Sequence, residues 1–173
     1  GLDLLFPHHE SEIAQSVCAF DCEPAKYWLH NNMITIGGQK MGKSLGNTIT
    51  LSEFFSGNHQ KLDKAYSPMT IRFFILQAHY RSTLDFSNEA LAAAEKGMKK
   101  MFEAQKKIDV LPVADKTSVD FDGVFKKCVE AMCDDFNTPV AIANMFEICR
   151  LINLVADKKE TISQADKDAL KEN

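Results

Sequence analysis

The sequence predicts a mainly α-helical protein with a small α/β part at its N-terminal end. Runs rich in β-branched and aromatic residues occur within the first 50 positions, beside an expected helix. From position 87 onwards, apolar residues recur every three or four positions, which is the spacing of packed helices. We therefore divide the chain into an α/β part at residues 1–50, a helical connector at 51–87 and a helical bundle at 88–173.

The α/β part is expected to contain one helix, two strands and a loop. Pro7 suits the first turn of a helix, which would carry His8 and Glu12 on neighbouring turns. An extended segment ending near Asp3 would precede this helix. The two strands are expected at residues 27–30 and 33–36.

Capping residues mark the helix boundaries in the rest of the chain. Ser67 before Pro68 predicts the start of a helix that is apolar nearly all round and should be buried between domains. Thr138 is the expected N-cap of a later helix, with Pro139 as its first residue. Further helices are indicated by the capping box Thr50-x-x-Glu53, by apolar stripes at 91–108 and 121–132, and by Ser163-x-x-Asp166. Short links between the last four helices predict a bundle.

The composition fits a globular protein and excludes several classes. A hydrophobic content of 45% in 173 residues is ample for a core. The net charge of −4 gives no overall nucleic-acid footprint, although a local basic face is sufficient to contact phosphates. The five cysteines form no C-x-x-C pair, so we expect reduced thiols in a cytoplasmic protein. We recognise no signal peptide and no apolar run long enough to span a membrane.

The stretch Lys-Met-Gly-Lys-Ser-Leu-Gly-Asn, from Lys40 to Asn47, is the most informative part of the sequence. Its lysines bring mobile positive charges, and its glycines let backbone N–H groups approach an anion closely. This composition predicts a loop that wraps a polyphosphate, with Lys40, Gly42, Lys43 and Ser44 as the binding residues.

A P-loop is an alternative interpretation of the same stretch, because residues 37–44 satisfy the pattern G-x-x-x-x-G-K-[ST]. A P-loop needs a long helix that starts inside it. Gly46-Asn47 follows almost at once and the next residues are largely β-branched, which disfavours such a helix. Lys43 would contact phosphate oxygens in either case, but the fold and the reaction product would differ.

His8 and Glu12 are candidate zinc ligands, because positions i and i+4 share a face of a helix. A His nitrogen and a carboxylate oxygen are both ligands that zinc accepts. Two ligands do not make a site, and Cys18 and Cys22 lie too far along the helix to complete it. The spacing alone favours a simpler alternative, an acidic first turn stabilised by the helix dipole.

Three motifs together resemble one enzyme family. Residues 40–44 resemble the Lys-Met-Ser-Lys-Ser signature of class I aminoacyl-tRNA synthetases, with Gly42 in place of the first serine. Residues 3–12 are similar to the Asp-Leu-x-Phe-Pro-His-His-Glu-Asn-Glu motif of cysteinyl-tRNA synthetases, with Ser11 in place of Asn. The Asp-Asp-Phe-Asn-Thr-Pro stretch at 134–139 resembles one in the helical domain of the same family.

The resemblance implies the end of a class I nucleotide-binding, Rossmann-like fold, followed by a helical connector and a bundle on the anticodon side of the tRNA. It implies catalytic and ATP-binding roles for Lys40 and Lys43 and a ribose contact for Asp3. It also implies Zn²⁺ held by His8 and Glu12, with two cysteines from segments upstream of this chain. Zinc would select cysteine, because it binds a thiolate strongly and a serine hydroxyl weakly.

The implied activity is ATP-dependent ligation of cysteine to its tRNA through a cysteinyl adenylate, with Mg²⁺ accompanying ATP. We expect a monomeric enzyme without a membrane partner. The chain has no initiator methionine and begins inside a motif, so we expect a piece of a longer protein that is inactive alone. Two alternatives stay open: a cysteine ligase that uses an amino-sugar acceptor, as in mycothiol synthesis, and a non-catalytic helical module that binds RNA or protein.

Trp28 resembles a Trp-x-His near the floor of the family's active site, and a core aromatic anchor is an equal interpretation.

Overall fold

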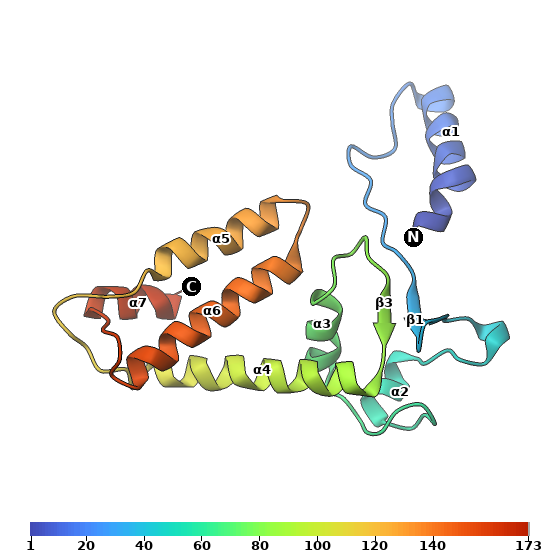
Figure 1. Cartoon of the computed structure of the whole chain (residues 1–173). Coiled ribbons are helices and arrows are strands. Elements are labelled where there is room, and N and C mark those ends of the chain that lie inside the picture. The colour runs from blue at the N-terminus through green and yellow to red at the C-terminus, as the bar shows by residue number, and fades with distance from the viewer. Residues whose placement is uncertain (173) are drawn as a thin grey trace. The chain divides into compact units, whose positions relative to one another are not determined.

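The computed structural model describes residues 1–172, which fall into two compact units. The first unit contains residues 1–50 and 80–87, and the second contains residues 51–79 and 88 onwards. The chain therefore leaves the first unit, returns to it once and leaves it again. Figure 1 shows α1, β1 and β3 in the first unit and the helices α2 to α7 in the second.

A three-stranded sheet in the order β2–β1–β3 organises the first unit. β1 spans Ile34–Ile36, β2 spans Gln39–Lys40 and β3 spans Leu84–Phe86. β1 is antiparallel to β2 and parallel to β3, so Thr35 lies between Lys40 on one side and Asp85 on the other. Gly37 and Gly38 make the tight turn from β1 to β2 at positive φ, which glycine adopts at little cost.

Three sequence expectations for this unit are wrong. Residues 27–30 form no strand, because the rings of Trp28 and His30 pack on His9 rather than along a sheet. The segment before the helix is a 3₁₀ turn, Leu2–Leu4, rather than a strand that ends at Asp3. β3 was not expected within the helical connector at 51–87, since three residues are too few to show a period-2 pattern.

α1 spans Glu10–Phe20 and starts later than the sequence predicts. Pro7 and His8 lie in an irregular helical turn, Leu5–His9, which leads directly into it. His8 and Glu12 therefore still lie on consecutive helical turns, as expected. The helix ends at Phe20. The Asp21 N–H still bonds the Val17 carbonyl, and the left-handed backbone of Asp21 (φ 53°) then turns the chain out of the helix.

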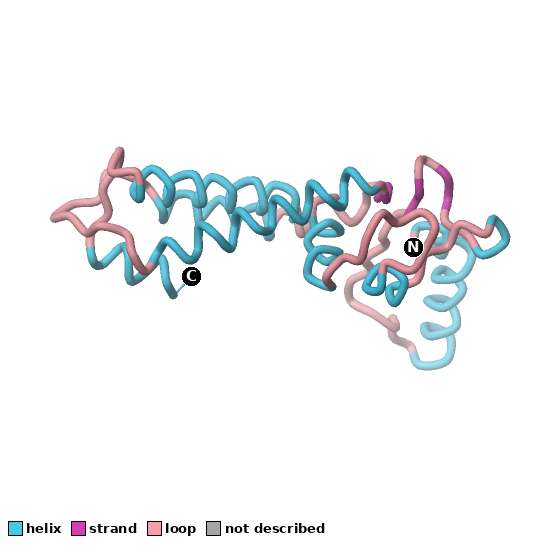
Figure 2. The backbone as a smooth tube through the Cα atoms, turned by 90° about the horizontal axis from the view of Figure 1, so that it is seen from below, coloured by secondary structure: helices cyan, strands magenta, loops and turns pink. Residues whose placement is uncertain are grey.

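The second unit is helical, and its last four helices confirm the predicted bundle. Figure 2 shows that most of the chain is helical. Figure 1 shows α5 and α6 as neighbours joined by a tight turn, and α6 also packs on α4. Gly97 in α4 lies close to the rings of Phe73 and Phe146, where a Cβ would come within 3.2 Å of Phe146. The helices are α2 (Leu51–Ser56), α3 (Pro68–Leu76), α4 (Asn88–Ile108), α5 (Phe121–Cys133), α6 (Thr138–Ala156) and α7 (Gln164–Glu172).

α3 begins as predicted but is not buried all round. The Ser67 hydroxyl accepts a hydrogen bond from the Thr70 N–H at 3.1 Å, which is the expected cap. Ile71 and Phe74 are buried, whereas Ile75 and Leu76 remain 43% and 39% exposed. The helix therefore buries one face only.

α6 is capped by Asn137 rather than by Thr138. The Asn137 side chain accepts from the Val140 N–H at 3.4 Å, and Thr138 is already the first helical residue. The two residues before Asn137, Asp135 and Phe136, both have left-handed φ angles, which complete the sharp turn from α5.

α6 also meets the length and composition of a membrane span, which we did not expect from the sequence. Six of its residues are buried and it packs on α4 and α5, as the core helix of a bundle does. Length and apolar composition alone are therefore weak evidence of a span in this helix.

A buried lysine joins α7 to the C-terminal end of α4. Lys167 is only 8% exposed, and its Nζ donates to the carbonyl oxygens of Asp109 (3.0 Å) and Leu111 (2.9 Å). These carbonyls follow the last turn of α4, where a positive charge also complements the helix dipole. Lys167 therefore serves as a buried cap for α4.

We predict that Lys167→Met lowers the free energy of unfolding by about 1–3 kcal/mol, because two buried carbonyl groups lose their partner. Lys171→Met is the matched control on the same helix, since its ion pair with Asp109 (2.8 Å) lies at the surface and should matter much less. Urea denaturation followed by circular dichroism measures both. Equal midpoints for the two variants would contradict the capping role.

Candidate functional site

The predicted phosphate-binding residues lie in one short loop, residues 40–47, here called the lysine loop. Lys40 ends β2, and the loop continues through a single 3₁₀ turn, Lys43–Leu45. Backbone bonds from Leu45 to Gly42 (3.1 Å) and from Gly46 to Lys43 (3.1 Å) define that turn. The loop is therefore folded rather than extended.

The structure excludes the P-loop interpretation. A P-loop feeds a long helix, but the helical turn here ends at Leu45 and the backbone becomes left-handed at Gly46 (φ 62°). Residues 47–50 are irregular, and the next helix, α2, is only six residues long.

Both lysines of the loop are available to a ligand. Lys40, Lys43 and Ser44 are exposed, and across residues 1–172 neither ammonium group has an ion-pair partner. A flexible ammonium with three free donors can follow phosphate oxygens as charge develops on them. The loop therefore presents two uncompensated positive charges on a folded backbone.

Gly42, which stands where the family signature has serine, neither loosens the loop nor supplies a free N–H donor. Its backbone is extended (φ −162°, ψ 141°), a conformation open to any residue, and a Cβ there would meet nothing closer than 3.9 Å. Its N–H donates to the Asn47 side chain at 2.9 Å and so does not replace the missing hydroxyl as a free donor. Glycine here thus removes a hydroxyl without being required by the backbone.

Asp85 fixes the hairpin that carries the loop. Its carboxylate Oδ1 accepts from the Thr35 hydroxyl at 2.5 Å and from the Gly38 N–H at 2.8 Å. The Thr35 hydroxyl, followed by the Gly38 N–H, holds the pKa of the Asp85 carboxyl below its ordinary value, since both bonds stabilise the charged form. The carboxylate thereby ties β3 to the β1–β2 turn, which directly precedes β2 and the lysine loop.

His8 and Glu12 fit half of a zinc site. Both are exposed, lie on consecutive helical turns and offer a nitrogen and a carboxylate oxygen. Within the described part of the chain, no group of three or more His, Cys, Asp or Glu side chains could hold a metal ion. All five cysteines are free thiols, and Cys18 and Cys22 are exposed further along α1 and beyond its end. Any metal site at His8 and Glu12 would need ligands from elsewhere.

Asp3 makes no hydrogen bond or ion pair with the lysine loop among residues 1–172. It is 58% exposed and its carboxylate contacts the amino group of Gly1 at 3.5 Å. No hydrogen bond or ion pair among residues 1–172 joins Asp3, His8 or Glu12 to the loop. Of the residues predicted to bind ATP, Lys40, Gly42, Lys43 and Ser44 therefore lie in one loop, and Asp3 lies outside it.

An aromatic cluster near His8 was missed by sequence reasoning. His9 Nδ1 lies 2.8 Å from His30 Nε2, and the Trp28 ring stacks on His30 with 9° between the ring planes. Trp28 Nε1 is shielded from solvent and has no hydrogen-bond partner among the described residues. The sequence signals for this cluster are the doubled histidine at 8–9 and the Trp-x-His at 28–30. Only the packing of the rings shows that His9 contacts Trp28 and His30.

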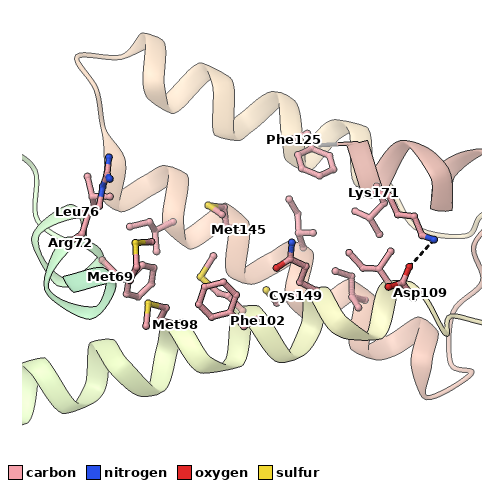
Figure 3. Close-up of a pocket in the computed structure, with 18 residues that line it drawn as sticks. Met69, Arg72, Leu76, Met98, Phe102, Asp109, Phe125, Met145, Cys149 and Lys171 are labelled. Carbon is pink, nitrogen blue, oxygen red and sulfur yellow. Dashed lines mark ion pairs between the residues drawn. The ribbon is translucent and has the colours of Figure 1, made fainter. Parts of the chain in front are cut away.

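The helical unit contains an apolar cavity of about 690 Å³ that is distinct from these residues (Figure 3). Figure 3 shows Met69, Met98, Phe102 and Met145 around it, and the ion pair between Asp109 and Lys171 at one end. None of the predicted site residues lines it. The cavity belongs to the packing of the bundle rather than to the phosphate site.

The hairpin with its exposed lysine loop and the helical bundle after it fit the class of protein that the motifs indicate, a class I aminoacyl-tRNA synthetase. The family described as "tRNA synthetases class I (C) catalytic domain" matches residues 1–96, and the DALR domain matches residues 127–173. Because the first match covers more than half of the chain, the protein belongs to the class I (C) tRNA synthetase family.

Curated relatives agree with this family. The chain is 57% identical over 171 residues to the cysteine–tRNA ligase of Porphyromonas gingivalis and 58% identical over 174 residues to that of Bacteroides thetaiotaomicron. Each alignment covers 99% of this chain and 35% of the relative. A third, from Cytophaga hutchinsonii, is 56% identical over 161 residues, 89% of this chain and 32% of the relative. The chain spans about a third of the length of these relatives.

We predict that Thr35→Val raises the pKa of the Asp85 carboxyl towards its ordinary value, because the hydroxyl is the main group that lowers it. A depressed carboxyl pKa adds stability above the unfolded-state pKa, and this stability is lost as the pH falls through the folded-state value. The variant should therefore be less sensitive to acid across that window. Carboxyl ¹³C NMR titration measures the pKa, with Ser82→Ala as the control. An unchanged Asp85 titration in Thr35→Val would refute the assignment.

Proposed function

We propose that the complete protein ligates cysteine to its tRNA, using ATP to form a cysteinyl adenylate first. The observation that carries this proposal is the lysine loop, which follows a hairpin fixed by Asp85 and whose two ammonium groups have no ion-pair partner among residues 1–172. Membership in the class I (C) synthetase family and the names of the relatives support cysteine as the amino acid.

Lys40 and Lys43 would act electrostatically. During adenylation, the cysteine carboxylate attacks the α-phosphorus of ATP, and negative charge builds on the departing pyrophosphate. Ammonium groups placed at these oxygens stabilise this charge more in the transition state than in bound ATP, with no covalent role. The Ser44 hydroxyl and Mg²⁺ that enters with ATP would share the phosphate oxygens.

His8 and Glu12 would hold zinc in the amino-acid pocket, together with ligands outside this chain. Zinc would supply a soft Lewis-acid contact that prefers the cysteine thiolate to the serine hydroxyl. A pocket without such a contact separates two near-isosteric side chains poorly. Their exposure and shared helical face support this role for the two residues.

The surface of the first unit supports its being part of a larger catalytic fold. Among its described residues only Asn47, Ile49 and Phe86 are buried. Large apolar side chains remain open instead, with Phe6, Phe20 and Tyr27 all more than three-quarters exposed. Strands that pair in parallel, as β1 and β3 do, normally lie in sheets that are covered on both faces in α/β enzymes. We propose that the remaining part of the synthetase covers these side chains.

The helical regions would serve the tRNA. We propose that residues 51–87, apart from the stretch 80–87 that belongs to the first unit, connect the catalytic fold to the bundle at 88–173, which would lie on the anticodon side. Lysines on α4 could contact tRNA phosphates, although Lys99 pairs with Glu95 (3.4 Å) and Lys107 donates to Asn153 (2.6 Å). We further propose a monomer that works in the cytoplasm, where its five free thiols would stay reduced.

The two alternatives are less well supported. An amino-sugar ligase would use the same cysteine pocket, but the relatives that match 99% of the chain are named as tRNA ligases. A non-catalytic module that binds RNA or protein is less well supported, because residues 1–96 match a family described as a catalytic domain.

We predict that Lys43→Ala in the complete enzyme slows cysteine-dependent ATP–pyrophosphate exchange by about 10²–10³-fold, the scale for losing one preorganised donor. The KM for cysteine should change little. Lys26→Ala, an exposed lysine in the same unit, is the control and should behave like wild type. A normal exchange rate in Lys43→Ala would show that the loop does not act on the phosphates.

We also predict that His8→Ala and Glu12→Ala reduce the zinc content of the complete enzyme and its preference for cysteine over serine. Each change removes one ligand of a four-coordinate site. Glu10→Ala, in the same first turn of α1, should retain zinc. Metal analysis after dialysis against a chelator gives the content, and pyrophosphate exchange with each amino acid gives the preference. Full zinc in both variants would mean that the ligands lie elsewhere.

A further inference from the structure

Asn47 is an unusual residue in this part of the molecule. It is 3% exposed, and its side chain is one of three polar or charged side chains that are buried among the described residues. Both ends of its amide are used: Nδ2 donates to the Lys40 carbonyl at 3.0 Å, and Oδ1 accepts from the Gly42 N–H at 2.9 Å. A buried amide that satisfies both its donor and its acceptor is held in one orientation.

These two bonds close the lysine loop on itself. The Lys40 carbonyl and the Gly42 N–H flank Met41, whose own N–H bonds the Ile34 carbonyl of β1 at 3.2 Å. The left-handed backbone at Gly46 turns the chain so that the next side chain points back to the start of the loop. The side chain thus fixes the backbone from which both lysines project.

We propose that Asn47 is a positioning residue, which sets the lysine loop in a shape ready for phosphates before ATP binds. This inference rests on the proposed function, because it assigns a role within the same phosphate site. Asn47 contacts no phosphate itself in this arrangement, since its side chain is buried and bonded to the loop backbone. Its effect would reach the reaction through the placement of Lys40 and Lys43.

The chemistry of the amide explains why other side chains should not replace it. Alanine would release both ends of the loop. Aspartate would keep the acceptor for the Gly42 N–H, but it would place a carboxylate oxygen against the Lys40 carbonyl and bury a charge. An unheld loop must order itself during the reaction, and misplacement of a catalytic group by about 1 Å can cost on the order of 100-fold in rate.

The test compares Asn47→Ala and Asn47→Asp with wild type in the complete enzyme. We expect kcat for ATP–pyrophosphate exchange, per active site titrated, to fall by about 10- to 100-fold in both variants. The KM for cysteine should stay within about twofold, because the defect lies on the phosphate side. Amide hydrogen exchange at Gly42 should become fast in Asn47→Ala and stay slow in Asn47→Asp, while the amides of β1 keep their wild-type protection.

Asn32→Ala is the matched control. Asn32 also bonds the backbone with both ends of its amide, to the Arg81 carbonyl (3.0 Å) and the Met33 N–H (2.8 Å), in the same unit but outside the loop. It should leave kcat and Gly42 exchange unchanged. If Asn47→Ala matches Asn32→Ala in kcat, or if its Gly42 amide stays protected, the positioning role is wrong.

The same experiment separates the two levels of inference. Wild-type enzyme without any cysteine-dependent exchange would overturn the proposed function, whatever the variants do. An active wild type with an unimpaired Asn47→Ala would overturn only the positioning role. A variant that loses thermal stability, with normal kcat per titrated site, would show a purely structural role and also count against the proposal. Should Asn47→Ala fold poorly, Asn47→Asp decides the question. We expect its kcat to fall while amide exchange at Gly42 stays slow, and a normal kcat would overturn the positioning role.

Discussion

The parallel register between β1 and β3 determines how the first unit presents its lysines. That register places Asp85 opposite Thr35, so that one carboxylate oxygen can reach the Thr35 hydroxyl and the Gly38 N–H together. Shifting the strands by one residue would turn Asp85 to the other face of the sheet. The β1–β2 turn would then lose its anchor, and with it the start of the lysine loop. A strand of three residues, 44 positions beyond Lys40, therefore governs the geometry of the site.

The chain returns to the first unit at residues 80–87, where it adds β3 beside β1. The helices between residues 51 and 79 belong to the second unit, so the sheet is completed only after them. The position of the loop therefore depends in part on a residue that is distant in sequence, and two side chains bond its backbone at different points. Asp85 holds the turn that precedes the loop, and Asn47 holds the backbone within it. Neither residue needs to contact a substrate to influence where the lysines lie.

Sequence reasoning succeeded where a pattern is local and repeated. The bundle helices follow from apolar residues at three- and four-residue spacing, and Ser67 and Ser163 cap α3 and α7 as their motifs indicate. It failed where the structure depends on distant partners. The run at 27–30 has strand-like residues, yet it forms no strand, because the rings of Trp28 and His30 pack against His9 instead. The two-residue strand β2 and the three-residue strand β3 are too short to show any periodicity.

The candidate site divides in the same way. The motif placed Lys40, Gly42, Lys43 and Ser44 in one loop correctly, because they are neighbours in sequence. The motif could not show which groups support the loop, since burial of Asn47 and the register of Asp85 are tertiary properties.

The state of Gly42 follows from these supports. A glycine is usually read as added freedom, yet here the backbone is extended and its N–H is held by Asn47. Replacing the family's serine with Gly42 therefore removes a hydroxyl without loosening the loop. Asn47 bonds the Gly42 N–H and the Lys40 carbonyl, so the backbone on both sides of Met41 is restrained although a glycine lies in the middle of the loop.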